Sequence, residues 1–173
     1  MLKMHFSKQF FVLAAIAVCC GLRVVSCESV DGNKTSLSPY LNKRYELAKG
    51  DDDNFEDLME YLGVGWLMRK AIVMAKPVME LKLGGGQYTL CSESFFKNIY
   101  TTFRLGVEFE EKTPDGRYVD TKFTAEGNKL TQTQKDEKGR VTTIVREFKP
   151  EEVVVTASVD KYSCVRIYKA VAV

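Results

Sequence analysis

The sequence predicts a mainly-β domain, a ten-stranded antiparallel up-and-down barrel interrupted once by a pair of short helices. Three observations support this. Beyond residue 77 the chain consists of short strand-like runs separated by turn signals such as LGGG, TPDG and AEGN. Before these runs the chain has one candidate strand followed by two segments with the sequence pattern of helices. No connection is long enough to be a crossover, and closure into a barrel removes the exposed edges of so many strands.

The first segment, residues 1–27, has the pattern of a secretory signal peptide. Lys3 and Lys8 precede the apolar run at 10–22, and small or modest residues follow at 25–27. The run is shorter than the ~20 residues that a membrane-spanning helix needs. We therefore expect cleavage at the end of this segment and a secreted protein, with an uncleaved anchor as the alternative.

Residues 28–41 are predicted to form a polar, flexible N-terminal extension ahead of the barrel domain at 42–173. The extension contains the triplet Asn33-Lys34-Thr35, a glycosylation sequon. Asn33 is therefore a candidate glycan site if the chain enters the secretory pathway.

The barrel domain is expected to open with a strand over 42–49. The acidic run GDDDN follows, in which Asp53 or Asn54 can cap a helix over 55–62. A second helix is predicted over 66–75 and ends before a Lys-Pro pair. The acidic run lacks the alternate spacing and distal Glu of a calcium loop, so no metal is expected there.

Nine further strands complete the expected barrel: 78–83, 87–93, 98–104, 107–112, 117–125, 129–135, 140–148, 152–158 and 162–169. Polar residues such as Gln132 and Thr142 occur on both faces of these strands, which suits a partly wet interior large enough for a small ligand. In the last strand Cys164, Arg166 and Tyr168 share one face. Alternation alone does not show whether that face points inward.

Charge and composition argue against several classes of function. The chain has a net charge of +2, but loss of Lys3, Lys8 and Arg23 with the leader would leave −1, so we expect no nucleic-acid partner. The single histidine, His5, would also be lost, which removes the usual triad or zinc chemistry. The glycines at 84–86 lack the Lys-Ser/Thr of a phosphate loop. We therefore predict no enzyme activity, catalytic residue, metal or cofactor.

The two cysteines beyond residue 27, Cys91 and Cys164, leave two interpretations open. They can form one disulfide in a secreted chain, or they can be two free, buried thiols.

Several stretches of the chain resemble the fatty acid-binding protein family of intracellular lipid-binding proteins. The stretch NFEDLMEYLGVGWLMRKAIVMAKP looks like the family's helix-turn-helix, and SESFFKNIYTTFRLGVEFEEKTPDGR resembles its middle strands. LTQTQK, TTIVREF and CVRIYK resemble the strands that end the barrel. The likeness runs in order over 42–170. It implies a calycin-like β-clam capped by two helices that holds one long-chain fatty acid.

Three features depart from the family pattern. Lys43-Arg44-Tyr45 stands where the family usually has Gly-x-Trp or Gly-x-Phe. The stretch between Leu47 and Asn54 is two residues longer than usual. Family members are typically cytosolic, so the leader and Asn33 would make this a secreted, invertebrate-type member.

The resemblance also implies site residues. In the family two arginines and a tyrosine on the last strands hold the ligand carboxylate, and the matching positions here are Arg146, Arg166 and Tyr168. The inward face of the last strand is then that of Arg166. Carboxylate and guanidinium are complementary in charge and in hydrogen bonding.

By the same resemblance the second helix and the turn around Phe96 form a portal. Phe55 and Met59, four residues apart on the first predicted helix, face the same way and can line the cavity roof; ordinary core packing is the alternative for these two. Arg69 and Lys70 are candidates for transient membrane contact through the helical cap, against the alternative of a solvated charged face.

The barrel is expected to be a monomer. Two other functions remain open for it: a carrier of a retinoid or another hydrophobic acid, and a secreted interaction protein with a secondary lipid site.

Overall fold

The computed structural model describes residues 37–171. The predicted signal peptide and Asn33 lie outside these residues. The described part contains ten strands, each within two residues of its predicted bounds: β1 (Arg44–Gly50), β2 (Val78–Gly84), β3 (Gln87–Glu93), β4 (Ile99–Phe103), β5 (Glu108–Lys112), β6 (Tyr118–Glu126), β7 (Lys129–Asp136), β8 (Val141–Phe148), β9 (Glu152–Val159) and β10 (Tyr162–Ala170). The predicted mainly-β fold is confirmed.

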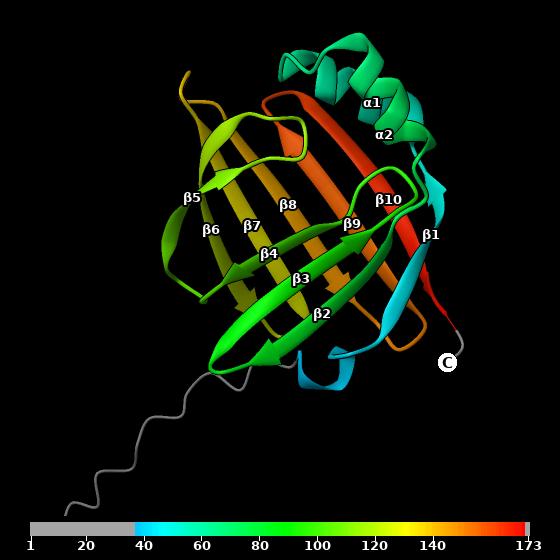
Figure 1. The fold of residues 1–173 in the computed structure, drawn as a ribbon, viewed down its shortest axis with the longest axis vertical. Coiled ribbons are helices and arrows are strands. Elements are labelled where there is room, and N and C mark those ends of the chain that lie inside the picture. The colour runs from blue at the N-terminus through cyan, green and yellow to red at the C-terminus, as the bar shows by residue number, and fades with distance from the viewer. Residues whose placement is uncertain (1–36, 172–173) are drawn as a thin grey trace, which may run out of the picture. The chain divides into compact units, whose positions relative to one another are not determined.

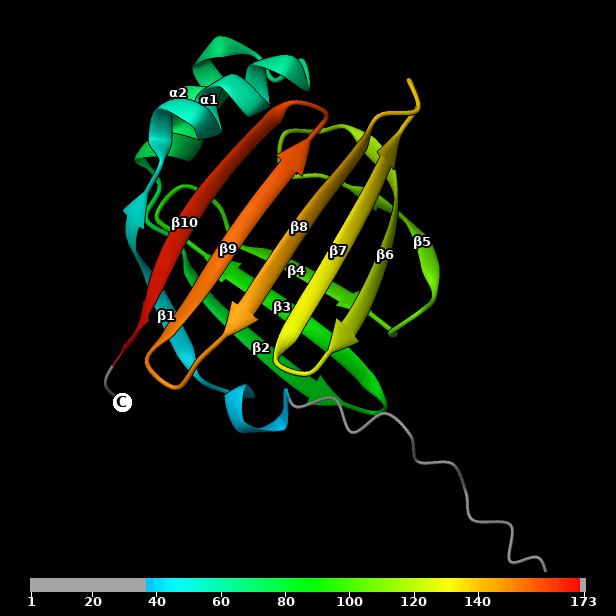
Figure 2. The ribbon, with the colours of Figure 1, turned by 180° about the vertical axis from the view of Figure 1, so that it is seen from behind.

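The strands form one antiparallel sheet in the order β4-β3-β2-β1-β10-β9-β8-β7-β6-β5. Consecutive strands pair with each other except β4 and β5, and β1 also pairs with β10, which brings the first and last strands together (Figures 1 and 2). The hydrogen-bonded sheet ends at β4 and β5, which do not pair with each other. The predicted closure therefore occurs at β1 and β10, whereas one seam remains open between β4 and β5.

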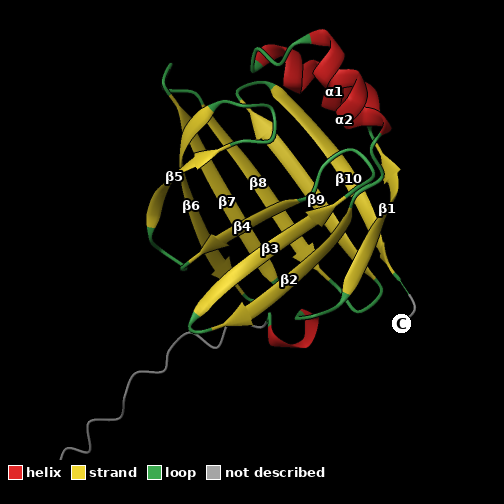
Figure 3. Ribbon diagram, viewed as in Figure 1, coloured by secondary structure: helices red, strands yellow, loops and turns green. Residues whose placement is uncertain are grey.

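Two helices, α1 (Asp52–Tyr61) and α2 (Trp66–Met74), lie over one end of the barrel (Figure 3). The predicted cap of α1 is wrong: the helix begins three residues earlier than expected, after Asp51, so Asp53 and Asn54 lie within it. Asn54 instead donates a hydrogen bond to the Asp51 carboxylate at 2.7 Å. Acidic residues in the first turn stabilise the helix dipole, which favours the earlier start.

No helix within residues 37–171 has the length and apolar character needed to cross a membrane.

The two helices differ in how firmly they are attached to the barrel. Helix α1 buries Leu58 and Met59, whereas α2 has no buried residue. Arg140, in the turn between β7 and β8, donates hydrogen bonds to the Tyr61 and Leu62 carbonyls at the end of α1 and to Asp136. Helix α1 is therefore tied to the barrel rim, and Gly63, with φ of 87°, begins the short link to α2.

The main hydrophobic core fills the opposite end of the barrel. Tyr45, Phe123 and Phe148 are fully buried there, and Phe103 stacks on Phe123. Residues 37–41, which the sequence analysis placed in the flexible extension, pack against this core. Leu37 is fully buried, and the Tyr40 ring stacks on Phe148. The apolar floor leaves the space beneath the helices for a cavity.

Candidate functional site

A cavity of about 290 Å³ lies inside the barrel between the apolar floor and the helical cap. It is bounded by side chains from both helices, from most strands and from the turns after β3 and β5. Its apolar wall includes Leu58, Leu62, Ile72, Leu90 and Ile144, and its polar wall includes Glu111, Gln132, Gln134, Thr142, Arg146, Arg166 and Tyr168.

Side chains of β10 point alternately into and out of the barrel, and this alternation positions Arg166 and Tyr168 on the polar wall. Cys164, Arg166 and Tyr168 are buried, while Val165 and Lys169 face outward. Opposite them, β1 contains an irregularity between Leu47 and Lys49, after which the register brings Gly50 beside Arg166. Both Arg166 and Tyr168 therefore line the cavity.

Arg166 has a buried guanidinium with unused donors. The residue is 7% exposed, and neither Nε nor Nη2 has a hydrogen-bond partner among the described residues. Its Cζ lies 4.4 Å from the centroid of the Phe55 ring, a cation–π contact from α1. Its Nη2 lies 3.7 Å from the Asp52 carboxylate, which is beyond hydrogen-bond distance.

Arg146, on the neighbouring part of the wall, is linked to an internal acid. Its Nη2 donates to Gln132 Oε1 at 2.9 Å, and Gln132 Nε2 donates to Glu111 Oε2 at 3.0 Å. Arg146 Nη1 is buried without a hydrogen-bond partner among the described residues. The two arginines thus differ, because only Arg146 is joined to a carboxylate through hydrogen bonds.

Glu111 is a cavity residue that the sequence pattern does not predict. Its Oε2 also accepts hydrogen bonds from Thr121 at 2.6 Å and Gln134 at 2.9 Å. Thr101 on β4 approaches Oε1 at 3.5 Å across the open seam. Period-two alternation places Glu111 on the face of Phe109, a signal that the acidic run EFEEK obscured.

The protonation states of the polar wall follow from burial. Burial lowers the pKa of Arg146 to about 10, and the proximity of Tyr168 and Glu111 opposes this effect. The guanidinium is therefore charged at neutral pH. Burial raises the pKa of Tyr168 although both arginines lower it, so the phenol stays neutral and can donate a hydrogen bond.

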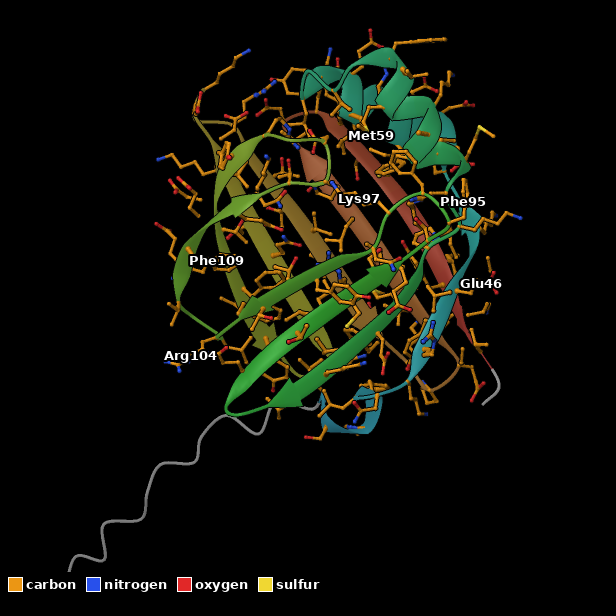
Figure 4. All side chains as sticks on the ribbon, viewed as in Figure 1. Glu46, Met59, Phe95, Lys97, Arg104 and Phe109 are labelled. Carbon is orange, nitrogen blue, oxygen red and sulfur yellow. The ribbon has the colours of Figure 1, made fainter. Side chains whose placement is uncertain are left out.

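The three residues expected at the roof and portal all line the cavity. Phe55 and Met59 enter it from α1, and Met59 is buried. Phe96, in the turn after β3, is 45% exposed. Figure 4 labels Met59 on α1 and labels Phe95 and Lys97, the chain neighbours of Phe96, in the turn after β3. Lys97 Nζ donates to the Pro114 carbonyl at 3.2 Å, which joins the turns on the two sides of the open seam.

Four large apolar side chains are exposed on α2 and on the turn after β3. We call them the apolar rim; they are Trp66, Leu67, Met74 and Phe95, with exposed fractions of 65% to 80%. By contrast, the basic residues of α2 are paired with acids of α1. Lys70 lies 2.7 Å from Glu56, and Arg69 lies 3.3 Å from Glu60.

Cys91 and Cys164 are both free and buried, and burial raises the pKa of each thiol. The thiols are therefore protonated at neutral pH, a poor state for a nucleophile. Within residues 37–171 no three His, Cys, Asp or Glu side chains are grouped to hold a metal ion.

An antiparallel ten-stranded barrel with an internal cavity and a two-helix cap places this protein in the calycin class of ligand-binding barrels. A family model described as the lipocalin / cytosolic fatty-acid binding protein family matches residues 43–171. The chain therefore belongs to this family, whose members bind and transport lipids.

Individual relatives agree with this assignment. A fatty acid-binding protein of Tyrophagus putrescentiae is 44% identical over 130 residues, which cover 75% of this chain and 96% of the relative. Among solved structures, a fatty acid-binding protein from Drosophila melanogaster brain tissue is 45% identical with a TM-score of 0.71, covering 76% of this chain and 99% of its own. A Schistosoma mansoni fatty acid binding protein in complex with arachidonic acid is 36% identical with a TM-score of 0.74. The match covers 79% of this chain and 99% of the Schistosoma chain.

Proposed function

We propose that this protein carries one long-chain fatty acid inside the barrel, as a monomer and without catalysis, and that Arg146, Arg166 and Tyr168 hold its carboxylate. The observation that carries the proposal is the set of unused guanidinium donors on the cavity wall: Nη1 of Arg146 and both Nε and Nη2 of Arg166. Buried donors of this kind are rare unless a ligand or water satisfies them.

A carboxylate fits these donors in charge as well as in hydrogen bonding. A buried ion without a partner costs several kcal/mol, and in the part of the chain that the structure describes the acid that offsets the charge of Arg166 is Asp52, which is half-exposed and 3.7 Å away. A carboxylate supplies a negative charge and accepts paired guanidinium bonds, directly or through water. The neutral Tyr168 hydroxyl adds a donor without adding charge.

The alkyl tail would supply most of the affinity. The apolar wall of the cavity includes Met59, Leu62 and Ile72 of the helical cap and Leu90 on β3. Burial contributes about 0.8 kcal/mol for each methylene, so about ten methylenes contribute roughly 8 kcal/mol before the costs of association. The head-group residues then select an acid over a neutral lipid of the same length.

The relatives support the same ligand class. The Tyrophagus and Drosophila proteins are named as fatty acid-binding, and the Schistosoma mansoni protein was solved with arachidonic acid. The thiols of Cys91 and Cys164 are buried and protonated, which makes them poor nucleophiles. This supports a protein that carries the ligand and does not convert it.

Replacement of the head-group arginines tests the binding site. We expect Arg146→Gln and Arg166→Gln each to weaken oleate binding by about 10- to 100-fold, because each removes charge-assisted hydrogen bonds. Binding of oleyl alcohol, which has no charge, should change far less. Displacement of a fluorescent fatty acid measures both, and retinoic acid in the same assay separates a fatty-acid carrier from a retinoid carrier.

Arg104→Gln is the matched control, because it removes the same charge from an exposed residue after β4 that points away from the barrel in Figure 4. Oleate affinity that is unchanged in both cavity variants, or lowered equally by the control, would show that the carboxylate is held elsewhere.

We also propose that the apolar rim contacts membranes during ligand transfer. Its side chains are exposed on α2 and on the turn of Phe96, whereas the charges of Arg69 and Lys70 are already offset by Glu56 and Glu60. Contact would then depend mainly on apolar burial and less on anionic lipid.

Transfer of a fluorescent fatty acid to phosphatidylcholine vesicles tests this contact. The rate should rise with vesicle concentration, and the combined Trp66→Ala and Phe95→Ala substitutions should lower it by about tenfold, because two large apolar side chains no longer enter the lipid. Tyr118→Ala, at an exposed aromatic residue on β6, is the control. A rate that does not depend on vesicle concentration would rule out collisional contact.

Finally, we propose that residues 1–27 direct secretion and that Asn33 carries a glycan. The basis is the basic and apolar pattern of the leader and the sequon that follows it. When the full chain is expressed in insect cells, the protein in the medium should begin near Glu28, and Asn33→Gln should reduce its mass by one glycan. Retention inside the cells with an intact N-terminus would contradict secretion.

A further inference from the structure

The first turn of α1 is fixed directly beside the arginine of the proposed carboxylate site. Strand β1 ends at Gly50, which pairs with Arg166 on β10. The next residue, Asp51, donates its backbone N–H to the Val165 carbonyl at 3.0 Å. Helix α1 begins at Asp52, so its N-terminus cannot move away from Arg166 without breaking this attachment.

Asp52 uses this position to place a carboxylate against the guanidinium. Its Oδ1 lies 3.7 Å from Arg166 Nη2. The arginine side chain is 8% exposed and the aspartate side chain is 51% exposed, so the pair spans the boundary between cavity and solvent. Because Nη2 has no hydrogen-bond partner within residues 37–171, Asp52 offsets the charge of Arg166 and leaves its donors free.

Gly50 makes the approach possible. A Cβ at this position would lie 2.5 Å from Asp52 Oδ1 and 3.2 Å from Arg166 Nε. A side chain would therefore occupy the space through which Asp52 reaches the guanidinium. The acidic residue itself belongs to the stretch between Leu47 and Asn54 that is two residues longer than the family pattern described above.

Helix α1 thus contacts the guanidinium with two side chains one turn apart. Phe55 packs its ring on Arg166, and Asp52 faces one end of the group. The partial positive charge at the helix N-terminus stabilises the Asp52 carboxylate in this place. A fatty carboxylate that enters the cavity meets Arg166 with another negative charge already beside it.

We propose that Asp52 is a built-in counter-ion of Arg166, with which an incoming carboxylate competes. This inference rests on the proposed carboxylate site. In the ligand-free protein Asp52 offsets part of the buried charge, and in the complex it repels the ligand carboxylate. Asp52 therefore lowers the affinity for acids and leaves the affinity for uncharged lipids unchanged. It makes carboxylate binding depend on the position of the first turn of α1.

The test compares Asp52→Asn with Asp53→Asn, which removes the same charge from the neighbouring exposed position of the same helical turn. Asp52→Asn should tighten oleate binding about two- to fivefold, the size expected for a partly exposed ion pair, and should leave oleyl alcohol binding unchanged. Asp53→Asn should alter neither. Competition titrations at constant ionic strength measure all four affinities.

Three results would overturn the inference. The first is an equal change of oleate affinity in Asp52→Asn and Asp53→Asn. The second is an equal change of oleate and oleyl alcohol affinity in Asp52→Asn. The third is weaker oleate binding by Asp52→Asn, which would mean that Asp52 orients the arginine for the ligand. Arg166→Gln in the same assay separates this inference from the proposed function. If that variant loses oleate affinity while Asp52→Asn has no effect, the carboxylate site stands and only the role of Asp52 fails.

Discussion

Unbalanced positive charge inside the barrel is the constraint on which the other features of the site depend. Arg146 and Arg166 both face one cavity, and only Arg146 is joined to an internal carboxylate, through the amide of Gln132. Asp52 reaches Arg166 from the cap at 3.7 Å and only partly offsets its charge. The cavity wall therefore carries positive charge that its own acids do not fully offset, and this favours the binding of an organic anion.

The fold supplies the two environments that such a ligand needs. Pairing of β1 with β10 places Arg166 and Tyr168 on the inner wall near the attachment of α1. The apolar floor around Phe123 and Phe148 limits the depth of the cavity. The cap adds apolar side chains above it, β4 and β5 do not pair with each other, and Phe96 in the turn before β4 also lines the cavity. A charged head group and an apolar tail can thus be bound in one compartment.

Much of the fold was readable from the sequence, because its signals are local. Turn residues separate every pair of strands after Pro77, and the glycines after Leu62 mark the break between the helices. The start of α1 was misjudged because four polar residues in succession can each act as a cap, and the contact of Asp51 with β10 decides between them. The open seam was missed because no local pattern records which strands fail to pair.

The site was only partly predictable for the same reason. Alternation places Arg166 and Tyr168 on one face but does not orient that face, since both faces of the barrel strands carry polar residues; the family resemblance was needed for the orientation. Glu111 was overlooked because its partners Thr121 and Gln134 lie on other strands. The approach of Asp52 to Arg166 depends on the β1–β10 register, which brings Gly50 beside the arginine. No local sequence pattern predicts this register.

The most direct test of the central claim is the ionisation of the bound ligand. NMR titration of oleate enriched with ¹³C at the carboxyl carbon reports that ionisation, over the pH range in which circular dichroism shows the protein to be folded. A carboxylate beside two guanidinium groups should have a lowered pKa, so its resonance should stay at the ionised position below pH ~4, where an ordinary carboxyl is protonated. A bound carboxyl that titrates like one in water would contradict the claim that the internal arginines hold it.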